Sequence, residues 1–189
     1  TSIPDVEALL KEPESSDLEV KGSAFVDINR WLLGDGKQVV SDRITNEGVG
    51  KAVVGLLNSD GGNVVVGALE RQKYERHDLK ALKDCPIVGD YILCGVAIDY
   101  QGKNWDSFQL RLQDIFEKRI VPSPMPWLHV ARVKVAGKEL CVLSVRSPSS
   151  DWFYLNYEDR MIFFVRQGNR TTEVPGPQAD QFKKAHPRQ

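Results

Sequence analysis

Leu56-Leu57-Asn58-Ser59-Asp60-Gly61-Gly62-Asn63-Val64-Val65-Val66-Gly67 is the stretch from which the fold can be read. Before and within it, apolar residues at positions 49, 53, 56 and 57 repeat with helical spacing, which predicts a helix over about residues 45–59. Thr45 or Asn46 is the expected N-cap. Gly61-Gly62 ends the helix, because glycine readily adopts the left-handed backbone of a C-terminal cap. The valine-rich run at residues 63–68 then predicts a buried strand.

The glycines of this junction do not form a phosphate-binding loop. No Gly-Lys-Ser/Thr follows them, which excludes a P-loop. They also come after a helix rather than before one, so they do not match the G-x-G-x-x-G dinucleotide pattern. Turn geometry alone accounts for them. We therefore expect no nucleotide cofactor.

Strands and helices alternate irregularly along the rest of the chain. Period-two alternation predicts strands at residues 17–21, 92–98 and 161–166, and a hairpin of 129–135 with 139–145 around Gly137-Lys138. Helical spacing predicts helices at 3–11, 106–120 and 177–185, the second with Asp106 and Gln109 as a capping box. A late antiparallel hairpin without a βαβ repeat predicts an α+β fold, a mixed sheet with flanking helices.

Composition limits the classes of function. The length of 189 residues predicts a single domain over residues 1–189. The net charge of −1, from 25 Lys+Arg against 26 Asp+Glu, excludes a polybasic coat but leaves room for a local basic patch. Three widely spaced cysteines without a C-x-x-C pair do not predict a zinc site, and we expect reduced thiols in a cytoplasmic protein. Neither a membrane helix nor a secretory signal is visible, so no membrane partner is expected.

Acidic residues near the first strand are candidates for chemistry. Glu19 and Lys21 would share one strand face, with Glu14 just upstream and Glu70 just after the glycine-valine stretch. Carboxylates beside an ammonium group recur where a metal-bound phosphodiester is hydrolysed, since carboxylates hold Mg²⁺ or Mn²⁺. The pattern alone is weak, because E-x-K is common by chance and a surface ion pair is the more ordinary interpretation.

Basic residues supply a second set of candidates. Residues 71–84 are rich in Lys and Arg interleaved with acids, and further basic residues follow downstream. Such residues neutralise phosphates in nucleic-acid-binding proteins, although a solvated mixed-charge surface explains residues 71–84 equally well. The candidates for nucleic-acid binding are Arg71, Lys73, Arg76, Lys118, Arg119, Arg166 and Arg170.

Taken together and in this order, four segments resemble the Schlafen AlbA-like domain, a divergent AlbA-type nucleic-acid-binding module. The resemblance covers about residues 10–175. Its segments are 14–21 (family style E-x4-E-[FY]-K), 56–67 (A-x-A-N-T-x-GG-x-L-x-x-G-V), the hairpin about Gly137-Lys138, and 164–171 ([YF]-x-R-x-G-[ST]-x-T).

The resemblance implies a site. In nuclease-active Schlafens three carboxylates form a metal-dependent ribonuclease centre that cuts structured RNA such as tRNA. By position they correspond to Glu14, Glu19 and Glu70, with Mg²⁺ or Mn²⁺ as the ion and Lys21 stabilising charge on the phosphate. Glu70 departs from the aspartate of the pattern and is one methylene longer. Residues 22–44 are a second departure and predict an inserted segment.

Three functions follow. The first is a metal-dependent endoribonuclease, which requires the three acids to converge around one cation. The second is a DNA- or RNA-binding module without catalysis, acting in regulation or in a defence system. The third is a protein-interaction domain, suggested by the near-neutral charge and the segment 22–44. Because related proteins pair two such lobes into a clamp, a homodimer is also implied by the resemblance.

Overall fold

The computed structural model describes residues 3–33, 40–75 and 79–188. The helices are α1 (Val6–Lys11), α2 (Ile28–Leu33), α3 (Asp42–Ile44), α4 (Lys51–Leu57), α5 (Arg71–Tyr74), α6 (Trp105–Arg119) and α7 (Gly176–Ala185). The strands are β1 (Leu18–Lys21), β2 (Gly62–Val66), β3 (Ala68–Glu70), β4 (Ile87–Val88), β5 (Tyr91–Leu93), β6 (Ile120–Val121), β7 (Leu128–Val135), β8 (Lys138–Val145), β9 (Tyr154–Tyr157), β10 (Arg160–Ile162), β11 (Phe164–Gln167) and β12 (Arg170–Glu173). In the part of the chain with described structure, no helix is long and apolar enough to cross a membrane.

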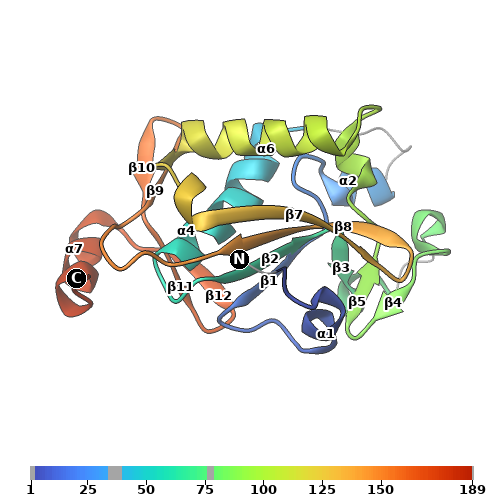
Figure 1. Ribbon diagram of the computed structural model, residues 1–189, viewed down its shortest axis with the longest axis horizontal. Coiled ribbons are helices and arrows are strands. Elements are labelled where there is room, and N and C mark those ends of the chain that lie inside the picture. Colours follow the sequence, from blue (N-terminus) through green and yellow to red (C-terminus); the bar gives the residue numbers. More distant parts are fainter. Residues whose placement is uncertain (1–2, 34–39, 76–78, 189) are drawn as a thin grey trace.

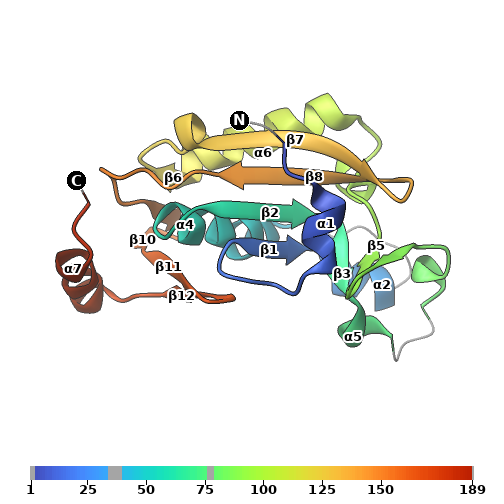
Figure 2. The ribbon, with the colours of Figure 1, turned by 60° about the horizontal axis from the view of Figure 1, so that its bottom comes forward.

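A mixed sheet of order β1-β2-β8-β7 forms the centre of the molecule, and Figure 2 shows these strands side by side. β1 runs parallel to β2, with Glu19 beside Val64 and Lys21 beside Val66. The other two pairings are antiparallel. The smaller sheet β3-β5-β4 lies beyond one end of the strands, and the hairpin β11–β12 and helix α7 lie towards the other (Figure 1 and Figure 2). This arrangement confirms the predicted α+β class.

Alternation along β2 divides the core between the two faces of the sheet. Val64 and Val66 belong to the main cluster, which includes the apolar sides of α4 and α6. Val65 points the other way, into a cluster with Val6 and Leu10 of α1. All three valines are fully buried. The valine run is continuous because both faces of β2 are covered, as expected for a central strand.

Several boundaries differ from the sequence predictions. The helix expected from Thr45 begins at Asp42, where Ser41 caps it, and passes through a π-helical turn at η1 (Thr45–Gly50) into α4. Thr45 and Asn46 are therefore buried within the helix instead of capping it. Tertiary packing, which local spacing does not report, decides where this helix starts.

Other local predictions were wrong in detail. The α6 cap is Asn104, whose side chain accepts from the Ser107 backbone N–H, rather than Asp106 with Gln109. The turn of the long hairpin is Ala136-Gly137, both with positive φ, one residue before the expected position. The strand expected at 161–166 is split into β10 and β11, and that expected at 92–98 covers only β5.

The segment 22–44 contributes α2, which packs against the small sheet. Leu32 is buried in a cluster with Leu69 of β3 and Ile92 of β5. The segment therefore has an apolar contact with the domain, and its interpretation as an insertion stays a prediction.

Gly62, at the start of β2, makes the closest backbone approach of the glycine-valine stretch. Its φ is +140°, and a Cβ built on it would lie 2.3 Å from the Asp17 carbonyl oxygen. We expect Gly62→Ala to lower the free energy of unfolding by about 3 kcal/mol, through overpacking and backbone strain, in urea titrations. Gly137→Ala is the control, because Gly137 has a φ of +83° but no atom within 4 Å of such a Cβ. Equal losses in the two variants would contradict this account.

Candidate functional site

Arg166 of β11 connects the C-terminal hairpin to the acidic segment near the N-terminus. Its guanidinium group is fully buried and forms an ion pair with Glu19. It also donates to the backbone carbonyls of Ser15 (2.6 Å), Ser16 (3.0 Å) and Leu18 (2.7 Å), and to the Thr171 hydroxyl (3.2 Å). These acceptors engage every nitrogen of the group. Arg166 was predicted to contact nucleic acid. Its side chain instead lies inside the protein, where it holds Glu19 and residues 15–18 in place.

Glu19 lies between two cations. One carboxylate oxygen accepts from Arg166 and the other from Lys21. Burial by itself would raise the pKa of Glu19, but Lys21 and Arg166 outweigh this effect and hold the pKa below its ordinary value. Glu19 is consequently a well-compensated carboxylate, with both oxygens already bonded.

Glu14 and Glu70 lie in the same neighbourhood but have separate partners. One Glu14 oxygen accepts from the Val20 backbone N–H at 2.8 Å. Burial raises the pKa of Glu14, and the nearby carboxylates of Glu19 and Glu70 add to the rise. Glu70, at the end of β3, is partly exposed and pairs with Lys73 at 2.6 Å. Of the three predicted acids, Glu14 is thus the one that lies close enough to feel the charges of both others.

As placed, these acids do not fit a three-carboxylate metal site. Within residues 3–33, 40–75 and 79–188, no three His, Cys, Asp or Glu side chains are positioned to hold one ion together. An ion at Glu19 would also face the positive charges of Lys21 and Arg166, which occupy both of its oxygens. Each oxygen keeps a further lone pair, so coordination by Glu19 would bring the ion close to these two cations and their charge would oppose it.

A polar groove lies over Glu19 and Lys21, and we call it the Lys51 groove. Its volume is about 230 Å³. It is lined by Glu19, Lys21, Glu47, Gly48, Lys51, Ala52, Asn169, Arg170 and Thr171. A second hollow of about 300 Å³ shares Lys21, Glu47 and Gly48 with it and continues towards Arg43 and Tyr74. One wall therefore comes from the helix of η1 and α4, the other from the hairpin β11–β12, and β1 lies between them.

Two cations of this groove have no carboxylate partner. In the described part of the chain, neither Lys51 nor Arg170 has an acidic oxygen within 4.0 Å, whereas Arg43 is paired with Glu47 at 2.7 Å. The Lys51 ammonium lies 5.6 Å from the centre of the Phe164 ring. The sequence prediction included Arg170 but missed Lys51. Its spacing from Glu47, four residues earlier, predicts an ion pair with that acid instead, so the sequence held no clear signal for Lys51 in this groove.

The remaining predicted basic residues lie elsewhere. Arg71 is paired with Glu75 at 2.6 Å, and Lys73 with Glu70. Lys118 and Arg119 lie in the last turn of α6 and are not among the residues that line the Lys51 groove. Arg76 lies outside the described residues.

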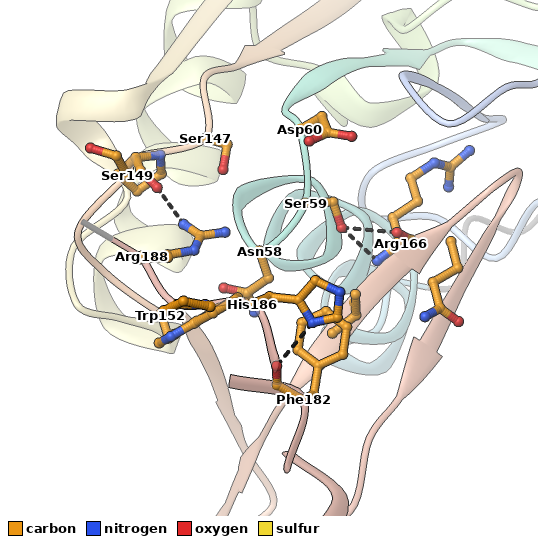
Figure 3. Close-up of a pocket in the computed structure, with 14 residues that line it drawn as sticks. Asn58, Ser59, Asp60, Ser147, Ser149, Trp152, Arg166, Phe182, His186 and Arg188 are labelled. Atoms are coloured by element: carbon orange, nitrogen blue, oxygen red, sulfur yellow. Dashed lines mark hydrogen bonds between the residues drawn. The ribbon is translucent and has the colours of Figure 1, made fainter. Parts of the chain in front are cut away.

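A larger cavity, of about 710 Å³, lies where α7 meets the end of α4 (Figure 3). Trp152, Phe182 and His186 form its aromatic wall. Its cation Arg188 stacks on Trp152 at 4.1 Å and donates to the carbonyls of Asp151 (2.7 Å) and Leu57 (2.9 Å). Because this guanidinium is already bonded to its own chain and the Arg166 side chain is directed to Glu19, the cavity offers little free positive charge. We therefore place the candidate site in the smaller Lys51 groove.

Comparisons with known proteins identify relatives of this fold. The family model described as Schlafen, AlbA_2 matches residues 14–175. The structure is similar to that of the DIP2311 protein from Corynebacterium diphtheriae (15% identity, TM-score 0.52), covering 96% of this chain and 28% of that one. It is also similar to the N-terminal domain of a protein from Nitrosomonas europaea named as RecG-related and as an ATP-dependent DNA helicase. That match has 16% identity and a TM-score of 0.51, and covers 87% of this chain and 89% of the domain. No curated protein sequence matches the chain.

The Glu19 carboxylate gives stability a specific pH dependence. Its pKa is lowered on folding, so its contribution is complete above the ordinary value of 4.5 and is lost as the pH falls through the lowered pKa. We expect Glu19→Gln to be less stable than the wild type by about 3 kcal/mol at neutral pH, because Arg166 loses its buried counter-ion. We expect this difference to shrink in urea titrations carried down to about pH 3. Glu7→Gln, which removes an exposed pair with Lys11, is the control. A difference independent of pH would refute the assignment.

Proposed function

The chain belongs to the Schlafen, AlbA_2 family, and from this premise we propose that it binds the sugar–phosphate backbone of RNA or DNA in the Lys51 groove. The observation that carries the proposal is a pair of cations, Lys51 and Arg170, that stand on opposite walls of a polar groove and have no acidic partner among the described residues. Cations that are already neutralised by carboxylates contribute little to phosphate binding, since their charge is compensated. Free cations release counter-ions from the nucleic acid when they bind.

Lys21 and Glu19 would form the floor beneath a bound phosphate. The Lys21 ammonium donates to Glu19, and the same side chain also lines the groove. The Arg166–Glu19–Lys21 series leaves the floor near neutrality or slightly positive, while Lys51 and Arg170 add positive charge at the walls. Such a local field is compatible with a chain whose net charge is only −1.

Binding and its salt dependence test this assignment. We expect Lys51→Ala and Arg170→Ala each to weaken binding of a fluorescent structured RNA about threefold to tenfold, and the double variant to lower the slope of log K against log salt by about 1.5. Lys118→Ala is the matched control, because it removes an exposed lysine outside the groove. Fluorescence anisotropy with RNA, single-stranded DNA and duplex DNA measures all four variants. Unchanged affinity and slope in the double variant would overturn the proposal.

Metal-dependent ribonuclease activity is the second candidate function. Glu14 favours it, because this half-buried carboxylate has a raised pKa and lies near Glu19 and Glu70. Against it, the carboxylates as placed do not form a metal site. The substrate implied by the family resemblance is structured RNA such as tRNA, and the ion is Mg²⁺ or Mn²⁺.

We expect the wild-type chain to bind tRNA without cutting it. Incubation with Mn²⁺, with and without EDTA, followed by gel analysis checks this expectation. Cleavage that requires Mn²⁺ and disappears in Glu14→Gln and Glu70→Gln would instead establish the ribonuclease and its metal site. The Lys51→Ala variant helps to separate binding from cleavage, because it is expected to weaken RNA binding while Glu14, Glu19 and Glu70 stay in place. Pairing of two copies into a clamp stays a prediction, which light scattering with and without RNA can check.

A further inference from the structure

Two cysteines, Cys85 and Cys94, flank the hairpin of β4 and β5, one just before β4 and the other just after β5. The strands pair Val88 with Tyr91 and Ile87 with Ile92, on either side of the turn Gly89-Asp90. Continuing this register pairs Cys85 with Cys94. The register does continue, because the Leu93 backbone N–H donates to the Pro86 carbonyl at 2.9 Å, one pair before the cysteines.

The position of the pair within the ladder is suited to a disulfide. Hydrogen-bonded and non-hydrogen-bonded pairs alternate along an antiparallel ladder. The 86/93 pair carries a hydrogen bond, so extending the register by one residue would make 85/94 a non-hydrogen-bonded pair. At such pairs the Cα atoms are about 4.5 Å apart and the side chains are on the same face. Disulfides span Cα separations of roughly 4.4 to 6.8 Å, so the backbone needs little movement to accept one.

The surroundings of the two thiols agree with this register. Both side chains pack in the same apolar cluster, beside Leu69 and Ile92. Both are free thiols at present, and each donates weakly to backbone carbonyls: Cys94 to Gly67 at 3.2 Å, and Cys85 to Ala81 at 3.7 Å. The third cysteine, Cys141, is fully buried in the central sheet and has no access to oxidants from solvent.

We propose that Cys85 and Cys94 are a redox modification site, at which a low-molecular-weight disulfide such as glutathione disulfide is exchanged for a cross-strand disulfide. The Cys85 thiolate attacks the oxidant, forming a mixed disulfide and releasing one glutathione thiolate. The Cys94 thiolate then attacks the Cys85 sulfur and releases the second. Two cysteine sulfurs are oxidised, one disulfide is reduced to two thiols, and the two cysteine protons pass to solvent and leaving groups.

The order of the steps follows from burial. Cys85 is the more accessible thiol, whereas burial raises the pKa of Cys94 to about 12 and the nearby Cys85 adds to the rise. The second step is therefore slow at neutral pH and accelerates about tenfold per pH unit below that pKa. The exchange also has a consequence near the Lys51 groove. The one S–H proton of Cys94 has two carbonyls in reach: that of Gly67 at 3.2 Å and, as the longer alternative, that of Gly22, the residue after Lys21, at 3.7 Å. A disulfide sulfur has no proton for either bond.

Mass spectrometry of the whole chain tests the proposal. Cys85 and Cys94 lie in one tryptic peptide, residues 84–103, because no Lys or Arg separates them. After treatment with glutathione disulfide and alkylation of remaining thiols, we expect this peptide about two mass units lighter than its reduced form and free of alkyl groups. Cys141→Ser should behave as the wild type. In Cys94→Ser the glutathione adduct should persist on Cys85, since the resolving thiol is absent.

Three results would overturn the proposal: both cysteines alkylated after oxidation, a stable glutathione adduct on Cys85 of the wild type, or a link to Cys141. Formation of the disulfide does not rest on the proposed function. Binding of RNA by the oxidised chain is a separate measurement, so the failure of one proposal is distinguishable from that of the other.

Discussion

The buried ion pair of Arg166 and Glu19 is the constraint on which the rest of the site depends. It joins residues 147 positions apart, and the same guanidinium bonds three carbonyls of residues 15–18. A buried arginine needs both a counter-ion and acceptors for its N–H groups, because either deficit costs several kcal/mol. Once these needs are met, the hairpin β11–β12 is fixed against β1. This contact positions the hairpin wall of the Lys51 groove relative to β1.

The motif residues at the end of α4 form a second connection to the same hairpin. The Asn58 side chain donates to the carbonyls of Phe153 and Phe164 and accepts from the Phe153 backbone N–H. Ser59 exchanges hydrogen bonds with the Arg166 backbone. A Cβ on Gly55 would lie 2.6 Å from the Thr171 methyl group, so α4 and β12 are in direct contact. Much of the family pattern in this chain therefore specifies how three distant segments meet.

This view explains why the acidic positions do not amount to a metal site as placed. Glu19 is needed by Arg166, and Lys21 completes its compensation, so the most buried of the three acids is already used for structure. Glu14 supports β1 through the Val20 N–H, and Glu70 is satisfied at the surface by Lys73. Lys51 and Arg170 then leave positive charge in the groove that no carboxylate in the described part of the chain neutralises. An external anion is the natural complement of such charge.

Much of the fold could be predicted from local pattern. The helix, the glycine pair and the valine strand at residues 45–68 follow from spacing and from the backbone freedom of glycine, and the long hairpin follows from alternation. Errors occurred where packing overrides local preference, as at Ser41, which caps a helix that begins before the apolar repeat, and at Phe163, where one expected strand is divided. The acidic and basic candidate residues could also be identified from the sequence, because residue type and order are enough to list them. Only the tertiary structure decided that Arg166 is internal while Lys51 has no acidic partner within residues 3–33, 40–75 and 79–188, because burial and ion pairing depend on which distant segments come together.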